Sequence, residues 1–371
     1  MQRTLFDKIT IGTSGLTSPN RIMRSSLWEC LAGDNGEMTP ELAEVMLELA
    51  RHHVGIIGFS FCFVANNARI CPKQLGIDTD QVAETYRKVV SDVKALGSVS
   101  MLQLMHGGRF AATPDPVGPS ATEFTGFDGT QFPKCREATK EDIDRIVKEF
   151  VAATVRAKEV GFDITMIHAC HLNLPSQFLS PMFNKRTDEY GGSLENRARF
   201  LLTIVREIKK AVGPDYPIAV KLNTDDTFPA GETLTYEESA QVAAWLAEAG
   251  VCLVEASSGG VGPRFSASRT GKDSVEGYHK EGARLWKKAI KDAGYEGKTL
   301  VALVGGIRSG KTAEEFLNDG TCDVVSVARP FVREPDLVDK WMENIEYRAK
   351  CGSCNKCCAS GKLGCVFNLK K

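Results

Sequence analysis

Eight short apolar runs rich in Val and Ile recur along the chain, and they restrict its fold more than any other feature of the sequence. Each run is long enough for a buried β-strand and too short for an independent helix. Helical patterns lie between most of the runs, so strands and helices alternate. The predicted strands are residues 20–25, 54–60, 100–105, 163–168, 217–222, 251–256, 299–304 and 322–328.

Alternating strands and helices predict a parallel sheet with right-handed crossovers, and eight such units favour a closed barrel. The length of 371 residues is within the range of a (β/α)8 barrel that carries insertions. We therefore predict an α/β fold, a TIM barrel over residues 1–345 followed by a cysteine-containing tail at 346–371. An open, doubly wound sheet is the alternative fold.

Helix positions are marked by periodicity and by capping signals. Apolar residues within 143–154 repeat at three- and four-residue intervals, which predicts a helix that packs on the fourth strand. Capping boxes, in which a Thr is followed three residues later by an acid, mark helix starts. The Thr–acid pairs with this spacing are Thr235 with Glu238, Thr312 with Glu315 and, in a weaker form, Thr139 with Asp142.

The charge balance points to a small-molecule partner. With 46 basic and 47 acidic residues, the chain has no net field that would favour nucleic acid or an anionic membrane. The first residues lack the apolar run of a secretory signal, and no stretch approaches the roughly 18 apolar residues of a membrane span. We therefore expect a cytoplasmic protein, whose 12 cysteines are thiols or metal ligands rather than disulfides.

Polar residues follow several predicted strands, where the active sites of barrels are found. Among them are two imidazoles three residues apart, which could both donate to one substrate oxygen. Such a pair could instead bind zinc, and Cys170 between the two histidines could be a third zinc ligand. The strand-end residues expected to converge on one cavity are Gln103, His106, Arg109, His168, His171, Lys221 and Asn223.

The last two strands are followed by signals for a phosphate site. Gly305 and Gly306 follow the seventh strand and would let backbone amides approach a ligand closely, and Arg329 follows the eighth. Barrels commonly hold a phosphate at these two loops. Glycines after a strand also serve as plain turn formers, but the adjacent arginine favours a phosphorylated cofactor.

Residues 167–200, IHACHLNLPSQFLSPMFNKRTDEYGGSLENRARF, resemble the signature of the Old Yellow Enzyme family. Further matches to this family are NRIMRSSLWE, LQLMHGGR, VKLN, LVGGIRS and VARPFVREPDL. The resemblance implies a non-covalently bound FMN at the top of the barrel, with NADH or NADPH as electron donor. It also implies reduction of an activated C=C bond in a small unsaturated substrate, and we expect a homo-oligomer.

The resemblance assigns roles to individual residues. Gln103 should bind the flavin pyrimidine ring, and Lys221 should replace the family's usual arginine near its N1–O2 edge. His168 and His171 should bind the electron-withdrawing oxygen of the substrate. The expected cofactor-binding residues are Ser25, Ser26, Phe61, Gln103, Lys221, Gly305, Gly306, Ala328 and Arg329. The expected substrate-binding residues are Trp28, Tyr278 and Arg264.

One departure from the family form concerns the proton donor. The family's tyrosine, two residues after the second histidine, is Asn173 here, and an amide is no general acid near neutral pH. Either Tyr190, Tyr278 or water protonates the substrate, or the reaction differs. The alternatives are a flavin-dependent dehydrogenase or demethylase of a small amine or alcohol, and a non-catalytic flavin-binding subunit.

Leu172 replaces the glycine of the family motif, and the bulky Trp28 lies near the flavin segment; with Asn173, these changes indicate a specialised pocket. The loop at 261–279 has no strong periodicity. We expect this loop to determine substrate specificity through Arg264, Arg269 or Lys272.

The tail resembles the cluster-binding segment of 2,4-dienoyl-CoA reductase relatives, in which cysteines hold a 4Fe–4S cluster. Those relatives carry a second flavin and nucleotide domain, so a cluster here would need an external electron donor. Structural zinc and a metal-free remnant are alternatives. A rival C-x2-C-x2-C pattern uses Cys357. The predicted ligands are Cys351, Cys354, Cys358 and Cys365.

Overall fold

A computed structural model describes most of the chain. The described residues are 2–123, 125, 131, 134–226, 233–259, 269–271, 274–357 and 361–368. The predictions for Arg264, Lys272 and Cys358 lie outside them.

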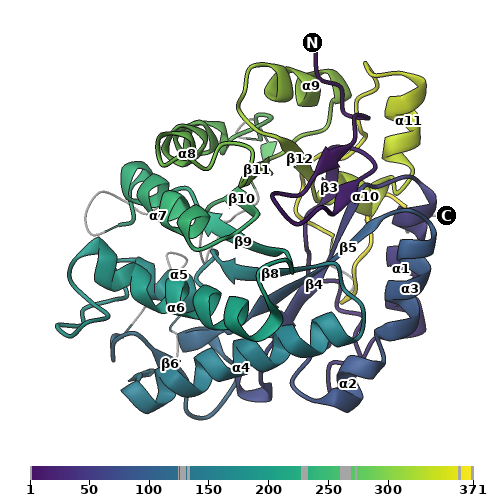
Figure 1. Cartoon of the computed structure of the whole chain (residues 1–371). Helices are drawn as coiled ribbons and strands as arrows, with labels where there is room; N and C mark the ends of the chain where they lie inside the picture. Colours follow the sequence, from purple (N-terminus) through teal and green to yellow (C-terminus); the bar gives the residue numbers. More distant parts are fainter. Residues whose placement is uncertain are drawn as a thin grey trace.

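Eight parallel strands close into a barrel, as predicted (Figure 1). Around the barrel the strand order is β10-β11-β12-β3-β4-β5-β8-β9, and every neighbouring pair is parallel. All eight predicted strands are confirmed, and the open doubly wound sheet is excluded. The barrel strands are β3 Ile22–Arg24, β4 Ile56–Phe63, β5 Val99–Met105, β8 Ile164–Ala169, β9 Ile218–Asn223, β10 Leu253–Ser257, β11 Leu300–Leu303 and β12 Val324–Val327.

Helices surround the barrel, because the outward side chains of the strands are apolar and must be covered (Figure 1). They are α1 Pro40–Arg51, α2 Asp80–Glu84, α3 Arg87–Ala95, α4 Lys140–Glu159, α5 Leu174–Leu179, α6 Leu194–Val212, α7 Tyr236–Glu248, α8 Lys280–Asp292, α9 Gly310–Asn318, α10 Arg329–Arg333 and α11 Leu337–Glu343. Short 3-10 turns lie at Asn66–Ala68 (η1) and Gly108–Phe110 (η2). Helix α4 packs on β5 and β8, so the predicted helix over the fourth strand is confirmed.

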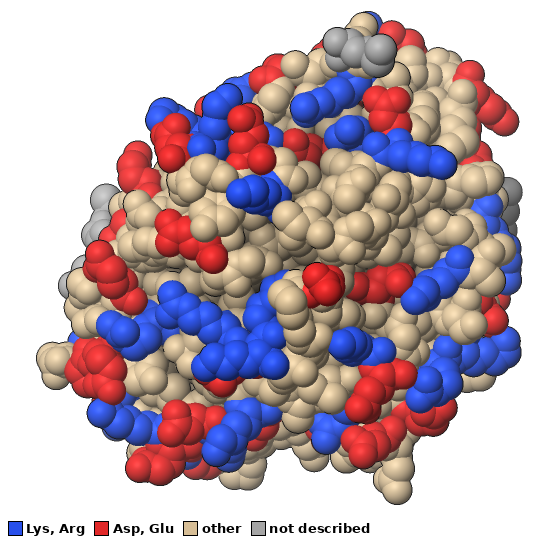
Figure 2. Space-filling view, in the orientation of Figure 1, with Lys and Arg blue, Asp and Glu red and all other residues tan. Residues whose placement is uncertain are grey.

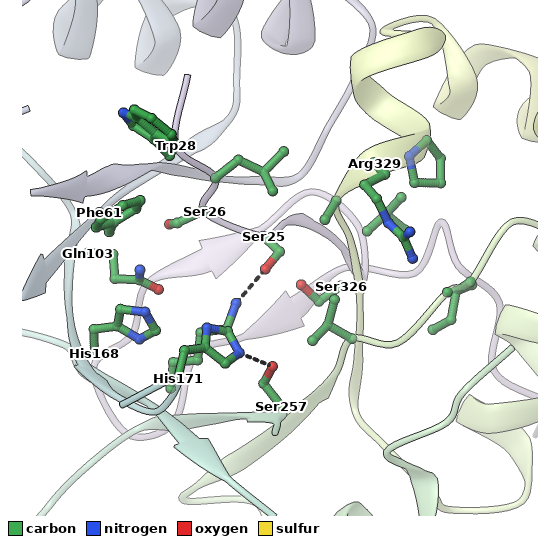
Figure 3. A pocket seen from close by; sticks show the side chains of 18 of the residues that line it. Ser25, Ser26, Trp28, Phe61, Gln103, His168, His171, Ser257, Ser326 and Arg329 are labelled. Atoms are coloured by element: carbon green, nitrogen blue, oxygen red, sulfur yellow. Dashed lines mark hydrogen bonds between the residues drawn. The ribbon is translucent and has the colours of Figure 1, made fainter. Parts of the chain in front are cut away.

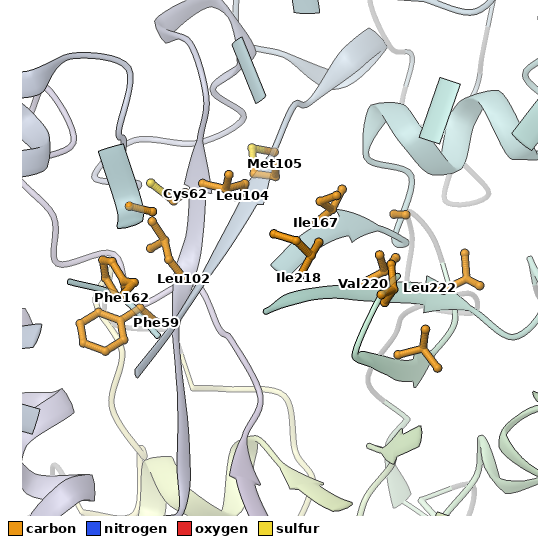
Figure 4. Packing of buried hydrophobic residues seen from close by; sticks show 14 of the residues in the cluster. Phe59, Cys62, Leu102, Leu104, Met105, Phe162, Ile167, Ile218, Val220 and Leu222 are labelled. Carbon is orange, nitrogen blue, oxygen red and sulfur yellow. The ribbon is translucent and has the colours of Figure 1, made fainter. Parts of the chain in front are cut away.

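Successive side chains of each strand point alternately out of and into the barrel, which creates two apolar layers. Outward residues such as Leu102, Ile167 and Val220 pack in the cluster beneath the helices (Figure 4). Inward residues such as Met101 and Met166 form a second cluster inside the barrel. Strand residues that follow these methionines by two positions therefore also face inward, one layer higher.

A two-stranded hairpin fills one end of the barrel. Strands β1 (Ile9–Thr10) and β2 (Thr17–Ser18) are antiparallel. Ile9 and Ile11 pack with Ile56, Val99 and Ile164, which lie at the first residues of the barrel strands. Another small sheet joins β6 (Val117–Gly118) to β7 (Arg136–Glu137). The open end is therefore the one at which the barrel strands terminate.

Two of the three predicted capping boxes are confirmed. Thr139 with Asp142 begins α4, and Thr235 with Glu238 begins α7, with reciprocal hydrogen bonds in both cases. The box predicted at Thr312 is wrong, because α9 begins earlier. Ser309 is the residue that caps it, and its hydroxyl accepts a hydrogen bond from the Thr312 amide at 3.3 Å.

The surface charges and the state of the cysteines can be compared with what the composition predicted. Figure 2 shows one face on which basic and acidic side chains are interspersed. Every cysteine that the structure describes is a free thiol. In the described part of the chain, no helix combines the length and the apolar character that a membrane crossing requires.

Candidate active site

A cavity of about 310 Å³ opens at the ends of the barrel strands (Figure 3). It brings together the described residues that were predicted to bind cofactor or substrate or to act in catalysis, with the exception of Gly305, Arg269 and Tyr190. The predicted residues that line it are Ser25, Ser26, Trp28, Phe61, Gln103, His168, His171, Asn173, Lys221, Tyr278, Gly306, Ala328 and Arg329.

Strand geometry explains why several of these side chains point into the cavity. Gln103 and His168 follow the inward methionines Met101 and Met166 by two positions, so they face inward in the next layer. The direction of the Phe61 side chain has a different cause. The register of β4 against β5 shifts between Phe59 and Phe61, and such an irregularity redirects a side chain.

The two histidines stand at the end of β8 with their rings close together. The ring centroids of His168 and His171 are 5.1 Å apart, with an angle of 85° between the planes. A left-handed turn brings His171 back over the cavity, with φ of 54° at His171 and 59° at Leu172. Leu172 replaces the family's glycine at this position, and non-glycine residues rarely adopt this conformation. His171 Nε2 lies 2.7 Å from Ser257 Oγ, which fixes the ring.

Both imidazoles are neutral near pH 7. Burial lowers the pKa of His168 well below its usual value, and the nearby Lys221 ammonium lowers it further. Burial also lowers the pKa of His171 well below its usual value, with His168 and Lys221 as smaller causes. A neutral imidazole keeps one N–H donor, so each ring can donate one hydrogen bond to a substrate oxygen.

Lys221 belongs to a buried network of four side chains. Its Nζ donates to Ser25 Oγ at 2.7 Å and lies 3.3 Å from Glu255 Oε2. Ser326 Oγ donates to Glu255 Oε1 at 2.7 Å. Lys221 and Glu255 are 3% and 0% exposed, so the two charges neutralise each other out of contact with solvent.

Two buried polar atoms at this end of the cavity have no partner in the protein. They are Gln103 Oε1 and Ser26 Oγ, on residues that are 1% and 8% exposed. Buried polar atoms are nearly always hydrogen-bonded, so these two indicate a ligand with polar groups in this place. Together with the Lys221 cation, they fit the polar pyrimidine ring of a flavin.

The other end of the cavity combines glycine backbone with arginines. Gly306 has a φ of 70°, and a Cβ there would lie 3.0 Å from the Tyr278 ring and 3.2 Å from the Val275 carbonyl oxygen. Arg308 and Arg329 both line this end. Gly305, with a φ of 143°, is next to the cavity but does not line it.

The cysteine tail reaches this arginine-rich end, which the sequence did not indicate. Arg329 Nη1 donates to Asn355 Oδ1 at 2.5 Å and to the Arg269 carbonyl oxygen at 3.1 Å. Ser353 is 2% exposed and lines the cavity. Its Oγ accepts hydrogen bonds from Ser274 Oγ at 2.9 Å and from Arg308 Nη1 at 3.4 Å.

Three strand-end residues predicted for the cavity do not line it. His106 Nδ1 accepts a hydrogen bond from the Gly108 amide at 3.0 Å, and Arg109 donates to Thr122. Both follow the end of β5, where the η2 turn leads the chain away from the cavity. Asn223 Oδ1 accepts a hydrogen bond from the His171 amide at 3.2 Å and so stabilises the left-handed turn at His171.

Asn173 and the two candidate tyrosines differ in position. Asn173 lines the cavity, with Nδ2 donating to the Cys170 carbonyl at 3.0 Å and Oδ1 without a hydrogen-bond partner. Tyr278 also lines the cavity. Tyr190 packs instead against Phe178, at a centroid distance of 6.2 Å.

Four tail cysteines surround a separate small cavity. These are Cys351, Cys354, Cys357 and Cys365, and Arg329 also lines it. The described members of the predicted ligand set are therefore in one place, and Cys357 of the rival pattern is with them.

Sequence reasoning missed Ser257, Ser326, Glu255, Arg308 and Ser353. Ser257 directly follows the predicted strand at 251–256, so the strand-end rule could have found it. Glu255 is an acid inside an apolar run, which is itself a signal for a buried charge partner. Ser353 has no local signal, because its role depends on a contact between distant segments.

The fold and the cavity together define a flavin-dependent oxidoreductase on a TIM barrel. The chain belongs to the NADH:flavin oxidoreductase / NADH oxidase family, since the sequence model of that family matches residues 4–348. It is 35% identical over 339 residues to an NADPH dehydrogenase of Bacillus cytotoxicus, covering 90% of this chain and 91% of the relative.

Solved structures agree with this assignment. The chain is similar to an Old Yellow Enzyme homologue of Zymomonas mobilis, with a TM-score of 0.78, 25% identity, and coverage of 94% of this chain and 95% of the other. It is also similar to a 2-naphthoyl-CoA reductase in complex with 2-naphthoyl-CoA, with a TM-score of 0.85 and 27% identity. That match covers 96% of this chain and 55% of the other, so the chain spans about half the length of that relative.

Family membership confirms the predicted enzyme class, an FMN-dependent oxidoreductase with NADH or NADPH as electron donor. The expected reaction class, reduction of an activated C=C bond, agrees with this membership.

Proposed function

We propose that this cavity binds FMN and reduces the C=C bond of a small unsaturated carbonyl compound held by His168 and His171. The observation that carries the proposal is a pair of neutral imidazoles, His168 buried and His171 partly buried, whose centroids lie 5.1 Å apart on the same cavity as Lys221 and Gln103. Both N–H groups can donate to the substrate oxygen, and these bonds strengthen as negative charge develops on it.

The residues around the cavity fit the two ends of FMN. Gln103, Ser26 and Lys221 would bind the pyrimidine ring, since their polar atoms include two without protein partners. Gly306 and Arg329 would hold the phosphate, with Arg308 beside them. The chemistry that FMN supplies when bound is hydride transfer.

Lys221 would supply a cation to the bound flavin, and Glu255 holds that cation in position. The 2.7 Å bond to Ser25 and the 3.3 Å contact with Glu255 leave the ammonium few alternative positions. A preorganised charge of this kind stabilises the transition state without reorganisation during the reaction.

Tyr278 is our candidate for the proton donor, with water as the alternative. Its ring lines the cavity, whereas Tyr190 packs on Phe178. Asn173 remains as a hydrogen-bonding group that shapes the substrate end. Because Asn173 replaces the tyrosine, a second candidate function is dehydrogenation or demethylation of a small amine or alcohol.

For the tail at 346–371, we propose a role in cofactor binding. Ser353 and Asn355 contact Arg308 and Arg329, so the tail completes the arginine-rich end of the cavity. The four described tail cysteines line one small cavity, although their sulfur atoms are not gathered as closely as metal ligands. Our first hypothesis for them is a 4Fe–4S cluster served by an external electron donor. Iron, zinc and sulfide analysis of anaerobically purified protein distinguishes a cluster from zinc and from metal-free thiols.

Stopped-flow absorbance tests the proposed reaction. NADH or NADPH should bleach the flavin band of FMN-loaded protein, and cyclohex-2-enone should then restore it. His168→Ala should slow the second step while flavin stays bound, whereas His53→Ala, a change on an exposed side chain, should leave both steps unchanged. Bleaching by an amine alone would favour the second candidate, and failure to take up FMN would refute both.

A further inference from the structure

Three potential metal ligands converge at the end of β8. His168, Cys170 and His171 each offer one ligand atom, and these atoms all lie within 4.8 Å of one another. Within the described residues, no other group of three or more His, Cys, Asp or Glu side chains is arranged in this way.

The distance between the His168 and Cys170 ligand atoms fits a tetrahedral ion. His168 Nδ1 is 3.6 Å from Cys170 Sγ. Zinc bonds of about 2.1 Å to nitrogen and 2.3 Å to sulfur, at a tetrahedral angle, separate the two ligand atoms by about 3.6 Å. Two imidazoles on one such ion have ring centroids about 5 Å apart, and those of His168 and His171 are 5.1 Å apart. Without metal, the 3.6 Å contact is a weak thiol–imidazole hydrogen bond.

The charges around these ligands permit a cation. Lys221 is the nearby positive group, and Glu255 neutralises it at 3.3 Å. Binding of Zn²⁺ would replace the thiol proton of Cys170, which leaves to the buffer, and form one Zn–S bond. The site would then carry one net positive charge, with both imidazoles as neutral ligands.

Access to the site is from the active-site cavity. His168 and His171 line the cavity (Figure 3), whereas Cys170 is fully buried and does not line it. Three protein ligands and one position open to a cavity are the arrangement of zinc sites that take an exogenous ligand. The open position would coincide with the place proposed for the substrate oxygen.

We propose that His168, Cys170 and His171 form a binding site for Zn²⁺ in the substrate end of the cavity, and that zinc and substrate exclude each other. The metal site rests on the geometry of the three side chains alone. Only the competition with substrate depends on the proposed function.

Zinc binding is tested on the full-length, FMN-loaded protein with ZnCl₂ as the probe. Calorimetric titration should show one more zinc per chain for the wild type than for Cys170→Ala. Zinc-edge X-ray absorption of the wild type should contain an ion with mixed nitrogen and sulfur ligands that Cys170→Ala lacks. Because the comparison is between two proteins with the same tail, any zinc on the tail cysteines cancels. Cys252→Ala removes another buried thiol, next to β10, and should leave the extra site intact.

Competition is measured by turnover. Zinc should inhibit enone reduction competitively, and Cys170→Ala should weaken the inhibition by at least the roughly 10- to 100-fold that loss of an outer-shell partner costs. Equal zinc stoichiometry, ligand spectra and inhibition in wild type and Cys170→Ala would overturn the metal site. Loss of the extra zinc in Cys170→Ala without competition in the wild type would retain the metal site and refute the proposed substrate position.

Discussion

Replacement of Glu255 by Gln should destabilise the protein strongly, because it leaves the Lys221 ammonium buried without its counter-charge. Glu255 is 0% exposed and its Oε2 lies 3.3 Å from Lys221 Nζ. At this distance two unit charges attract each other by about 5 kcal/mol when the effective dielectric constant is about 20. Loss of one partner from a buried pair costs about 3–5 kcal/mol in measured cases. We therefore expect the free energy of unfolding to fall by about 3–5 kcal/mol.

Urea unfolding followed by circular dichroism measures this change on the flavin-free protein. Lys221→Met should also destabilise, and the double variant Lys221→Met/Glu255→Gln should recover part of the loss, since no charge is then left unpaired. Glu44→Gln is a matched control, because it removes an exposed carboxylate that pairs with Arg51, and it should have little effect. A Glu255→Gln variant as stable as the Glu44→Gln control would refute the argument.

Further predictions concern the proton donor, the tail and the pH dependence of stability. Asn173→Tyr should raise turnover of simple enones if the missing donor limits the rate, and an unchanged rate would show that protonation uses another route. Ser353→Ala should raise the FMN dissociation constant about tenfold in a fluorescence titration of apoprotein, the effect of one lost charge-assisted hydrogen bond; unchanged affinity would place Ser353 outside the cofactor site. The Arg136 guanidinium holds the pKa of Asp142 below its usual range, so its stabilisation is present above the unfolded pKa of about 3.9 and is lost as the pH falls. Asp142→Asn should lower stability by about 1 kcal/mol at pH 7 and by less near pH 3, and a constant difference in urea unfolding would contradict this cause.

The barrel was predictable because its strands are buried on both faces. Such strands appear in a sequence as continuous apolar runs, and all eight were recognised. The start of α9 was misplaced because Ser309 and Thr312 are both good capping residues, and the choice between them depends on where the preceding loop ends.

The candidate site was predictable to the extent that strand geometry determines it. Gln103, His168 and Lys221 lie within strands, so their inward direction follows from the two-residue period. His106 and Arg109 come after the strand, where the backbone path of the turn decides their direction, and no strand rule applies to a turn. The contribution of the tail depends on contacts between segments far apart in the sequence, which local patterns do not contain.

The β1–β2 hairpin has a kinetic consequence. Because Ile9 and Ile11 fill the lower end of the barrel, molecules that react at the cavity enter and leave at the strand ends. A nicotinamide nucleotide and an unsaturated acceptor would then reach the cavity through a shared entrance. The order of events would follow from this sharing: the first product departs before the second reactant arrives, and initial-velocity plots at several acceptor concentrations would be parallel lines.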